Sequence, residues 1–163
     1  MRSLILLTVI LIGSASLFDI NAQRAHLSKD YTAAVGLLAG SSIGVTGKYF
    51  IAPDFAVEAH FASRRRGLEI AGFGLLHRDI KKDHDFNWFF GGGAHVGFAE
   101  YSNSDLGQRT EATLGIDGML GLEYTFEQLP LNLAVNWKPE FNFTGVTGLD
   151  LASAGISIRY VLR

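Results

Sequence analysis

Apolar and polar residues alternate along most of the chain, in segments separated by short polar or glycine-rich links. In the last segment Ile156, Ile158, Tyr160 and Leu162 alternate with small or charged residues. Successive side chains of a β-strand point to opposite faces, so each such segment predicts a strand with one apolar face. No window of comparable length has the 3.6-residue period of a helix. Eight strands are predicted, at residues 31–39, 43–51, 55–62, 68–77, 87–98, 116–124, 131–138 and 155–162.

The face opposite the apolar stripe carries mainly Gly, Ala, Ser and Thr, with a few charges of both signs. A soluble barrel would expose this face and should cover it with long Lys and Glu side chains. Small residues with sparse, paired charges fit instead the lumen of an eight-stranded barrel, which side chains just fill. We expect a polar network in that lumen, in which Arg159 pairs with Glu58, Glu69, Asp117 or Glu123. Its members are Lys48, Glu58, His60, Glu69, His95, Asp117, Glu123, Lys138 and Arg159.

The apolar face carries aromatic residues near the ends of the predicted strands, as the interfacial girdles of membrane barrels do. Strands that cross lipid must close into a barrel, because lipid cannot satisfy an open edge. The sequence therefore predicts an all-β fold, an eight-stranded antiparallel up-and-down transmembrane β-barrel closed by pairing of the last strand with the first. A soluble, lipocalin-like ligand-binding barrel is the alternative. The aromatic positions are Tyr31, Tyr49, Phe61, Trp88, Tyr124, Trp137 and Tyr160.

The first residues have the layout of a cleavable secretory signal peptide. Arg2 supplies a positive charge, residues 4–12 form an apolar run interrupted only by Thr8, and small residues follow. This run is too short to be a spanning helix. We expect cleavage after Gln23, which divides the chain into a signal peptide at residues 1–23 and one barrel domain at residues 24–163.

The order of the strands assigns the links between them to the two sides of the membrane. With both termini in the periplasm, the short links at 52–54 and 126–130 are periplasmic and the longer polar segments at 100–113 and 144–153 are outer loops. Arg64, Arg65 and Arg66 then lie at an outer loop. They are candidates for contact with lipopolysaccharide phosphates, and a solvated loop is the alternative.

Candidate chemistry in the sequence is sparse. Glu58 and His60 share a face, which His95 should join, but no serine is tied to them by a motif and their spacing matches no known metal-ligand pattern. The absence of cysteine excludes thiol catalysis, and the net charge of −2 gives no reason to expect nucleic acid. Gly91-Gly92-Gly93 is not a phosphate loop, because no helix follows it. We predict no catalytic, metal or cofactor-binding residue and no cofactor.

The predicted signal peptide, the eight alternating strands and the terminal Ile156–Leu162 segment together resemble the small outer-membrane β-barrel proteins, such as the membrane domain of outer membrane protein A. The block from Gly121 to Phe126, followed by Leu129–Leu133 and Trp137-Lys138-Pro139, is similar to bacterial members of this group. The resemblance implies the outer membrane of a Gram-negative-type bacterium, with its lipids and the barrel assembly machinery as partners. It implies no single function.

The sequence leaves four classes of function open. The leading hypothesis is a structural or surface-interaction role without catalysis, in which the outer loops meet an extracellular ligand of unknown identity. A narrow, porin-like pore is the second, and it ranks lower because an eight-stranded barrel leaves little open channel. A lipid A-modifying enzyme is the third, and a soluble, secreted ligand carrier is the fourth.

Overall fold

The computed structural model describes residues 31–64, 67–80, 86–103, 107–145 and 147–163. The predicted signal peptide, residues 1–23, lies outside these ranges. Within them, no helix is long and apolar enough to cross a membrane.

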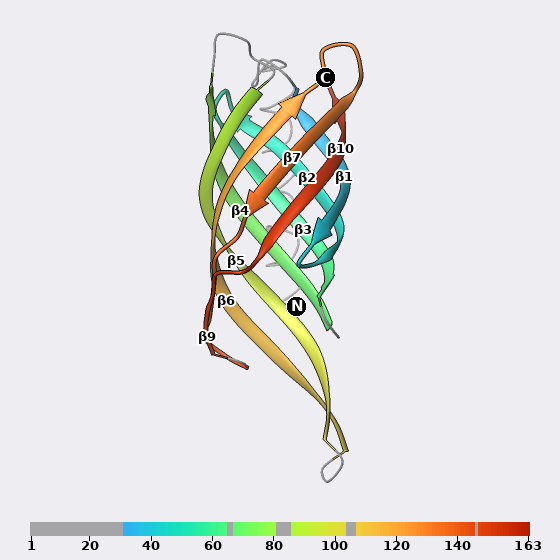
Figure 1. Ribbon diagram of the computed structural model, residues 1–163, viewed down its shortest axis with the longest axis vertical. Coiled ribbons are helices and arrows are strands. Elements are labelled where there is room, and N and C mark those ends of the chain that lie inside the picture. Colours follow the sequence, from blue (N-terminus) through green and yellow to red (C-terminus); the bar gives the residue numbers. More distant parts are fainter. Residues whose placement is uncertain (1–30, 65–66, 81–85, 104–106, 146) are drawn as a thin grey trace, which may run out of the picture.

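In the described residues, ten strands form one antiparallel sheet, of which eight close into a barrel (Figure 1). The other two, β8 (Glu140–Asn142) and β9 (Gly148–Asp150), form a small hairpin that pairs with β6. The barrel strands are β1 (Ala33–Gly40), β2 (Ile43–Ala52), β3 (Phe55–Arg64), β4 (Gly67–Asp79), β5 (Phe86–Asn103), β6 (Gly107–Thr125), β7 (Leu131–Trp137) and β10 (Ala154–Leu162).

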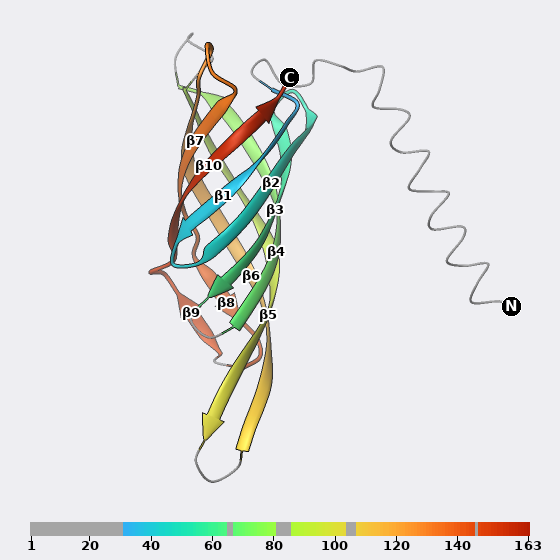
Figure 2. The same cartoon turned by 90° about the vertical axis from the view of Figure 1, so that its right-hand side faces the viewer.

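The barrel closes where its last strand meets its first. β10 pairs antiparallel with β7 on one side and with β1 on the other, and Gly36 lies opposite Arg159. Figure 2 shows β10, β1 and β2 side by side along this seam. The eight-stranded antiparallel barrel predicted from the alternating pattern is confirmed, including its closure by the final segment.

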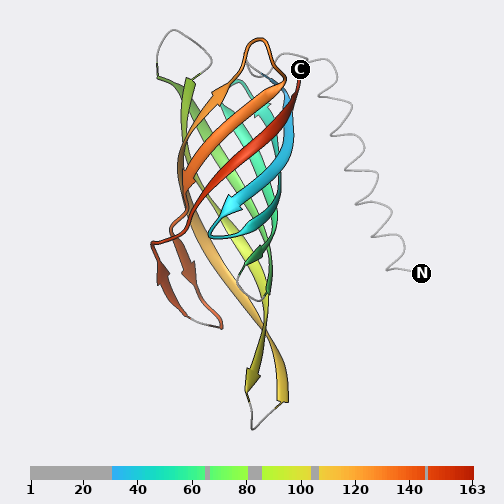
Figure 3. The ribbon, with the colours of Figure 1, turned by 45° about the vertical axis from the view of Figure 1, so that its right-hand side comes forward.

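The two ends of the barrel differ in shape. One end, called here the turn end, carries the links at residues 53–54 and 126–130 together with the C-terminus. At the other, the hairpin end, β5 and β6 run past the barrel. Their last rungs, from Glu100–Thr110 to Asn103–Gly107, pair only with each other. The β8–β9 hairpin stands beside the barrel toward this same end (Figure 3).

The prediction of a loop at residues 100–113 is therefore wrong, because β5 extends to Asn103 and β6 begins at Gly107. Two strands can pair through backbone hydrogen bonds alone, without an apolar face. This polar stretch is therefore β-structure although its sequence shows no alternation of apolar and polar residues. The predicted loop at 144–153 contains β9. The partner strand β8 was not predicted, because three residues are too few to display a period.

The burial pattern is the inverse of that of a soluble protein. On β10, Ile156, Ile158 and Tyr160 are exposed on the outside, whereas Ser157 and Arg159 are completely buried inside. The other barrel strands repeat this arrangement. The predicted aromatic girdle is exposed at Phe61, Trp88, Tyr124, Trp137 and Tyr160 and partly exposed at Tyr49.

Tyr31 is a correction to the predicted girdle. It is only 2% exposed, and its hydroxyl reaches Glu123 inside the barrel at 3.2 Å. The residue precedes the start of β1 at Ala33, so the alternation that places Val35 and Leu37 outside does not extend back to it.

A row of rings fills the interior near the turn end. Tyr31 packs edge-on against Phe50 with centroids 5.1 Å apart, Phe50 lies 4.8 Å from His77, and His77 stacks on Phe89 at 5.3 Å. The ammonium of Lys48 lies 4.5 Å above the Phe89 ring, within the range of a cation–π contact. The interior is therefore packed rather than open at this level.

Gly36 should be essential for barrel closure. A Cβ at this position would overlap the carbonyl oxygen of Ile158 on the paired β10, whereas a Cβ at Gly47 on β2 would meet nothing within 4 Å. We expect Gly36→Ala to lower the free energy of unfolding by about 1–3 kcal/mol, as overpacking does. Gly47→Ala, the matched control, should change it by less than about 0.5 kcal/mol. Urea unfolding of the two variants in detergent measures the difference, and equal stabilities would contradict the role of Gly36.

Candidate functional site

Four charged side chains meet at the centre of the barrel and form what we call the central network: Lys48 of β2, Glu58 of β3, Glu123 of β6 and Arg159 of β10. The ammonium of Lys48 lies 2.7 Å from Glu123 and 3.2 Å from Glu58. Arg159 donates to Glu58 and lies 3.9 Å from Glu123. All four side chains are fully buried, and two positive charges face two negative ones.

Polar neighbours add hydrogen bonds to these charges. His60 lies 2.8 Å from Glu58 and Thr46 donates to the same carboxylate at 3.1 Å. Arg159 also donates to the amide oxygen of Asn132 at 3.2 Å. Buried charges are tolerated when they are paired and hydrogen-bonded. Each charge of the central network has an ion-pair partner and at least one hydrogen bond, although Oε2 of Glu58 and Nε of Arg159 form no hydrogen bond within the described residues.

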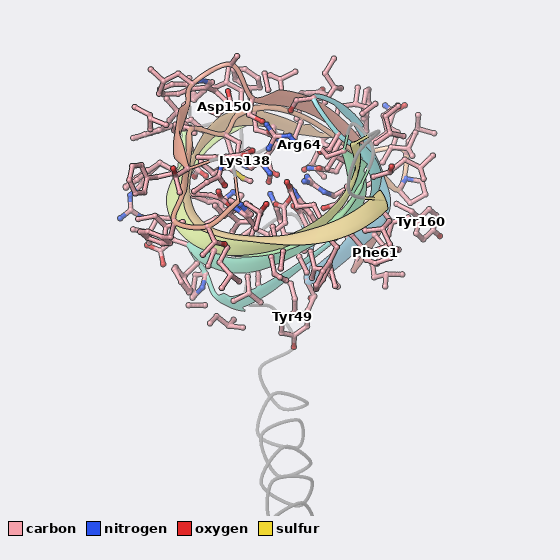
Figure 4. The ribbon with its side chains drawn as sticks, turned by 90° about the horizontal axis from the view of Figure 1, so that it is seen from below. Tyr49, Phe61, Arg64, Lys138, Asp150 and Tyr160 are labelled. Atoms are coloured by element: carbon pink, nitrogen blue, oxygen red, sulfur yellow. The ribbon has the colours of Figure 1, made fainter. Side chains whose placement is uncertain are left out.

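A second group of charges, the mouth network, lies nearer the hairpin end and consists of Arg64, Glu69, Lys138, Glu140 and Asp150. Arg64 contacts Glu140, lies 2.7 Å from Asp150 and lies 3.4 Å from Glu69. Lys138 lies 2.7 Å from Glu69 and 3.1 Å from Glu140. Figure 4, viewed from this end, shows Arg64, Lys138 and Asp150 inside the ring of strands and Tyr49, Phe61 and Tyr160 outside it.

His95 and Asp117 face each other beside the mouth network. Nδ1 of His95 lies 2.7 Å from Oδ1 of Asp117, and Nε2 lies 2.9 Å from the amide oxygen of Asn142 on β8. Glu140 is paired in register with Asp117 across β8 and β6. His95, Asp117 and Glu140 each offer one nitrogen or carboxylate oxygen that could bind a metal ion, and these three atoms lie within 4.8 Å of one another.

An ion pair at the turn end joins two neighbouring links. Arg78, at the end of β4, donates to the Asp54 carboxylate at 2.5 Å. This hydrogen bond holds the pKa of the exposed Asp54 carboxyl below its usual value. The pair is open to solvent, so we assign it little stabilising effect.

The structure places all nine residues of the sequence-based lumen network inside the barrel. Lys48, Glu58, His60, Glu123 and Arg159 gather in or against the central network, and Glu69, His95, Asp117 and Lys138 gather at or beside the mouth network. Sequence reasoning missed Glu140 and Asp150, which lie on strands too short to show a pattern.

Arg64 has a different environment from the one expected for a lipopolysaccharide contact. Both of its terminal nitrogens contact carboxylates of the mouth network, so the structure does not support that role for this side chain. Arg64 is an even number of residues from Glu58 and His60 on β3, so its side chain lies on the same, interior face of the strand. This spacing could have predicted its position from the sequence. Arg65 and Arg66 lie outside the described residues.

Among the described residues, no serine hydroxyl contacts a histidine. The contacts of His60, His77 and His95 are made with carboxylates, the Asn142 amide and neighbouring rings, and none is made with a serine. Ser153 donates instead to Glu140 at 2.8 Å. A hydrolase of the serine–histidine type needs a hydroxyl within hydrogen-bond reach of its histidine, and these contacts do not provide one.

Comparison with known proteins shows a likeness of fold. No protein-family model matches the sequence, and no curated protein matches it. Among solved structures, the barrel is similar to the N-terminal β-barrel domain of OprF from Pseudomonas aeruginosa, with a TM-score of 0.67 and 12% sequence identity over 82% of this chain and 98% of that one. The resemblance to small eight-stranded barrels is thus confirmed for the architecture.

Removal of the Arg159 charge should strongly destabilise the barrel. Arg159→Met leaves Glu58 and Glu123 with Lys48 as the remaining cation of the central network, and breaking a buried pair typically costs about 3–5 kcal/mol. Glu58→Gln together with Arg159→Met restores the charge balance, so the double variant should be more stable than Arg159→Met alone. Urea unfolding of both single variants and the double variant measures this coupling. Additive effects would show that the two side chains do not depend on each other.

Proposed function

We propose that this protein is an outer-membrane β-barrel with a structural or surface-interaction role, and that it neither catalyses a reaction nor conducts solutes. Its immediate partners are then the lipids of the outer membrane and the barrel assembly machinery. The projecting hairpins provide the surface for an extracellular ligand.

The observation that carries this proposal is the inversion of polarity between the two faces of the closed sheet. Fully buried Arg159 and Glu123 lie inside, while apolar side chains cover the outside. A soluble protein would pay a large free-energy cost for exposing this much apolar surface to water. Lipid removes that cost, and a closed barrel leaves no unpaired strand edge within it. Exposed apolar residues on β1, β2, β6 and β10 include Val35, Leu37, Ile43, Val45, Leu120, Leu122, Ile156 and Ile158.

The shape of the two ends supports an orientation with the hairpin end outside the cell. Outer-membrane barrels usually have short periplasmic turns and longer extracellular loops. Here the turn between β2 and β3 spans only residues 53–54, whereas β5 and β6 extend past the barrel at the opposite end.

The packed interior supports a non-conducting role. Phe89 and Leu75 are fully buried among the side chains of the lumen, and the row of rings from Tyr31 to Phe89 crosses the interior near the turn end. Closer to the centre, the four charges of the central network neutralise one another. A solute would have to displace both layers.

Location and orientation can be tested together by labelling single cysteines, because the natural chain contains none. Leu149 lies exposed on β9 at the hairpin end, and Gln128 lies exposed in the link between β6 and β7 at the turn end. On intact cells, a membrane-impermeant maleimide should label Leu149→Cys and leave Gln128→Cys unlabelled. After the outer membrane is permeabilised, both should react.

Two results, one from the labelling and one from cell fractionation, would reject parts of the proposal. Labelling of Gln128→Cys alone on intact cells would reverse the orientation. Recovery of the protein in the soluble fraction without detergent, with no change of gel mobility on boiling, would reject the membrane barrel itself.

The closed lumen predicts that the purified, folded protein adds no stepwise conductance to a planar bilayer. Protein unfolded by boiling serves as the control for non-specific leakage. Reproducible single-channel steps from the folded sample alone would replace the non-conducting role with that of a narrow pore.

A further inference from the structure

Asp117 is a buried carboxylate whose bonding is incomplete. Its side chain is fully buried, and among the described residues its one ion-pair partner is His95. The second oxygen, Oδ2, is buried without a hydrogen-bond partner in the part of the chain that the structure describes. A buried carboxylate oxygen without a donor is costly, so the position calls for a bound positive group.

The charge balance around Asp117 indicates the same need. In the central network two cations meet two carboxylates. In the mouth network, together with Asp117, the two cations Arg64 and Lys138 meet four carboxylates. Among the described residues, the excess of two negative charges equals the charge of one divalent cation. The carboxylates are Glu69, Asp117, Glu140 and Asp150.

The geometry points to a binding site for a divalent transition-metal ion of the zinc type, with His95, Asp117 and Glu140 as ligands. One ligand atom from each already lies within 4.8 Å of the others. In a tetrahedral zinc site with bonds of about 2.0–2.2 Å, ligand atoms lie roughly 3.3–3.6 Å apart, so the three side chains need to move inward only slightly. With Nδ1 of His95 turned to the ion, Nε2–H can donate to the amide oxygen of Asn142, the kind of hydrogen bond that fixes the orientation of a metal-binding imidazole.

The donor set selects the class of ion. An imidazole with two carboxylates suits zinc and its neighbours in the transition series, whereas magnesium and calcium prefer oxygen ligands alone. The ion would reach the site through the hairpin end, where the Asp150 side chain is 30% exposed and that of Arg64 18%. This site does not depend on the membrane in which the barrel resides.

Glu140 shares its carboxylate with cations that are already present. It accepts hydrogen bonds from Arg64 and from Ser153, and Lys138 lies 3.1 Å away. A metal ion must therefore compete with Arg64 for Glu140. Arg64 has alternative partners at Asp150 (2.7 Å) and Glu69 (3.4 Å), which allow it to release Glu140 without losing all of its charge pairing.

A proton on His95 is the competing occupant. An imidazolium would donate to Asp117 Oδ1 and to the Asn142 amide oxygen, which matches the observed contacts. It would leave Asp117 Oδ2 without a partner. The two alternatives differ in their response to added metal, because a protonated His95 binds none.

The test is a calorimetric titration of zinc chloride into the full protein, purified in detergent and stripped of metal with EDTA. Wild type should bind one zinc ion. Asp117→Asn and His95→Gln should each weaken the affinity by about tenfold or more, since even supporting residues of metal sites have effects of this size. Asp54→Asn, which removes an exposed carboxylate at the other end of the barrel, should leave it unchanged. Magnesium chloride should bind far more weakly than zinc.

Heat-dependent gel mobility verifies that each variant is folded before titration. Should one of the two site variants fail this check, the other, together with Glu140→Gln, still tests the site. Absence of zinc binding by the wild type would overturn the proposal and favour the protonated His95. Zinc binding of unchanged affinity in the folded site variants would also overturn it, because the ion would then bind elsewhere.

Discussion

Each of the four buried charges at the centre of the barrel depends on the two charges of opposite sign. A charge taken out of water is stabilised only if partners replace the lost hydration, and here Lys48, Glu58, Glu123 and Arg159 replace it for one another. The four residues come from four different strands, so their contacts exist only when those strands are in the correct register. A shift of one residue would turn a charge toward the outer face, which makes the network a strong determinant of register.

The apolar outer face and the polar interior are two consequences of one two-residue period. On β10 the same nine-residue strand presents Ile158 to the outside and Arg159 to the interior. The interior is not uniformly polar, however. Phe50, Phe73, Leu75 and Phe89 fill the space that charges and small residues leave, and Lys48 and Lys138 lie over two of these rings. Packed rings and paired charges therefore share the interior of the barrel.

The sequence allowed the barrel to be predicted because strand alternation is strictly local and repeats eight times. It placed residues such as Glu58 and Arg159 on the interior face, where the structure has them. It failed where local pattern stops. Tyr31 precedes its strand, Glu140 follows Pro139 on a strand of three residues, and the extensions of β5 and β6 are paired only with each other. His95 lies near Glu140 because β8 pairs with β6. This pairing cannot be predicted from the alternation of residues along the sequence.

The contact between Arg159 and Glu58 has a consequence for the order of events during assembly. The two residues are 101 positions apart, and Lys48 is 75 positions from Glu123. Until β10 arrives beside β1, Glu58 lacks its guanidinium partner and the edge of β1 is unpaired. The pairing of β10 with β1 therefore closes the sheet and neutralises the interior charge in the same step. The chain commits to its final state only when its C-terminal strand has been delivered, so an arrested intermediate holds both an open edge and an uncompensated charge.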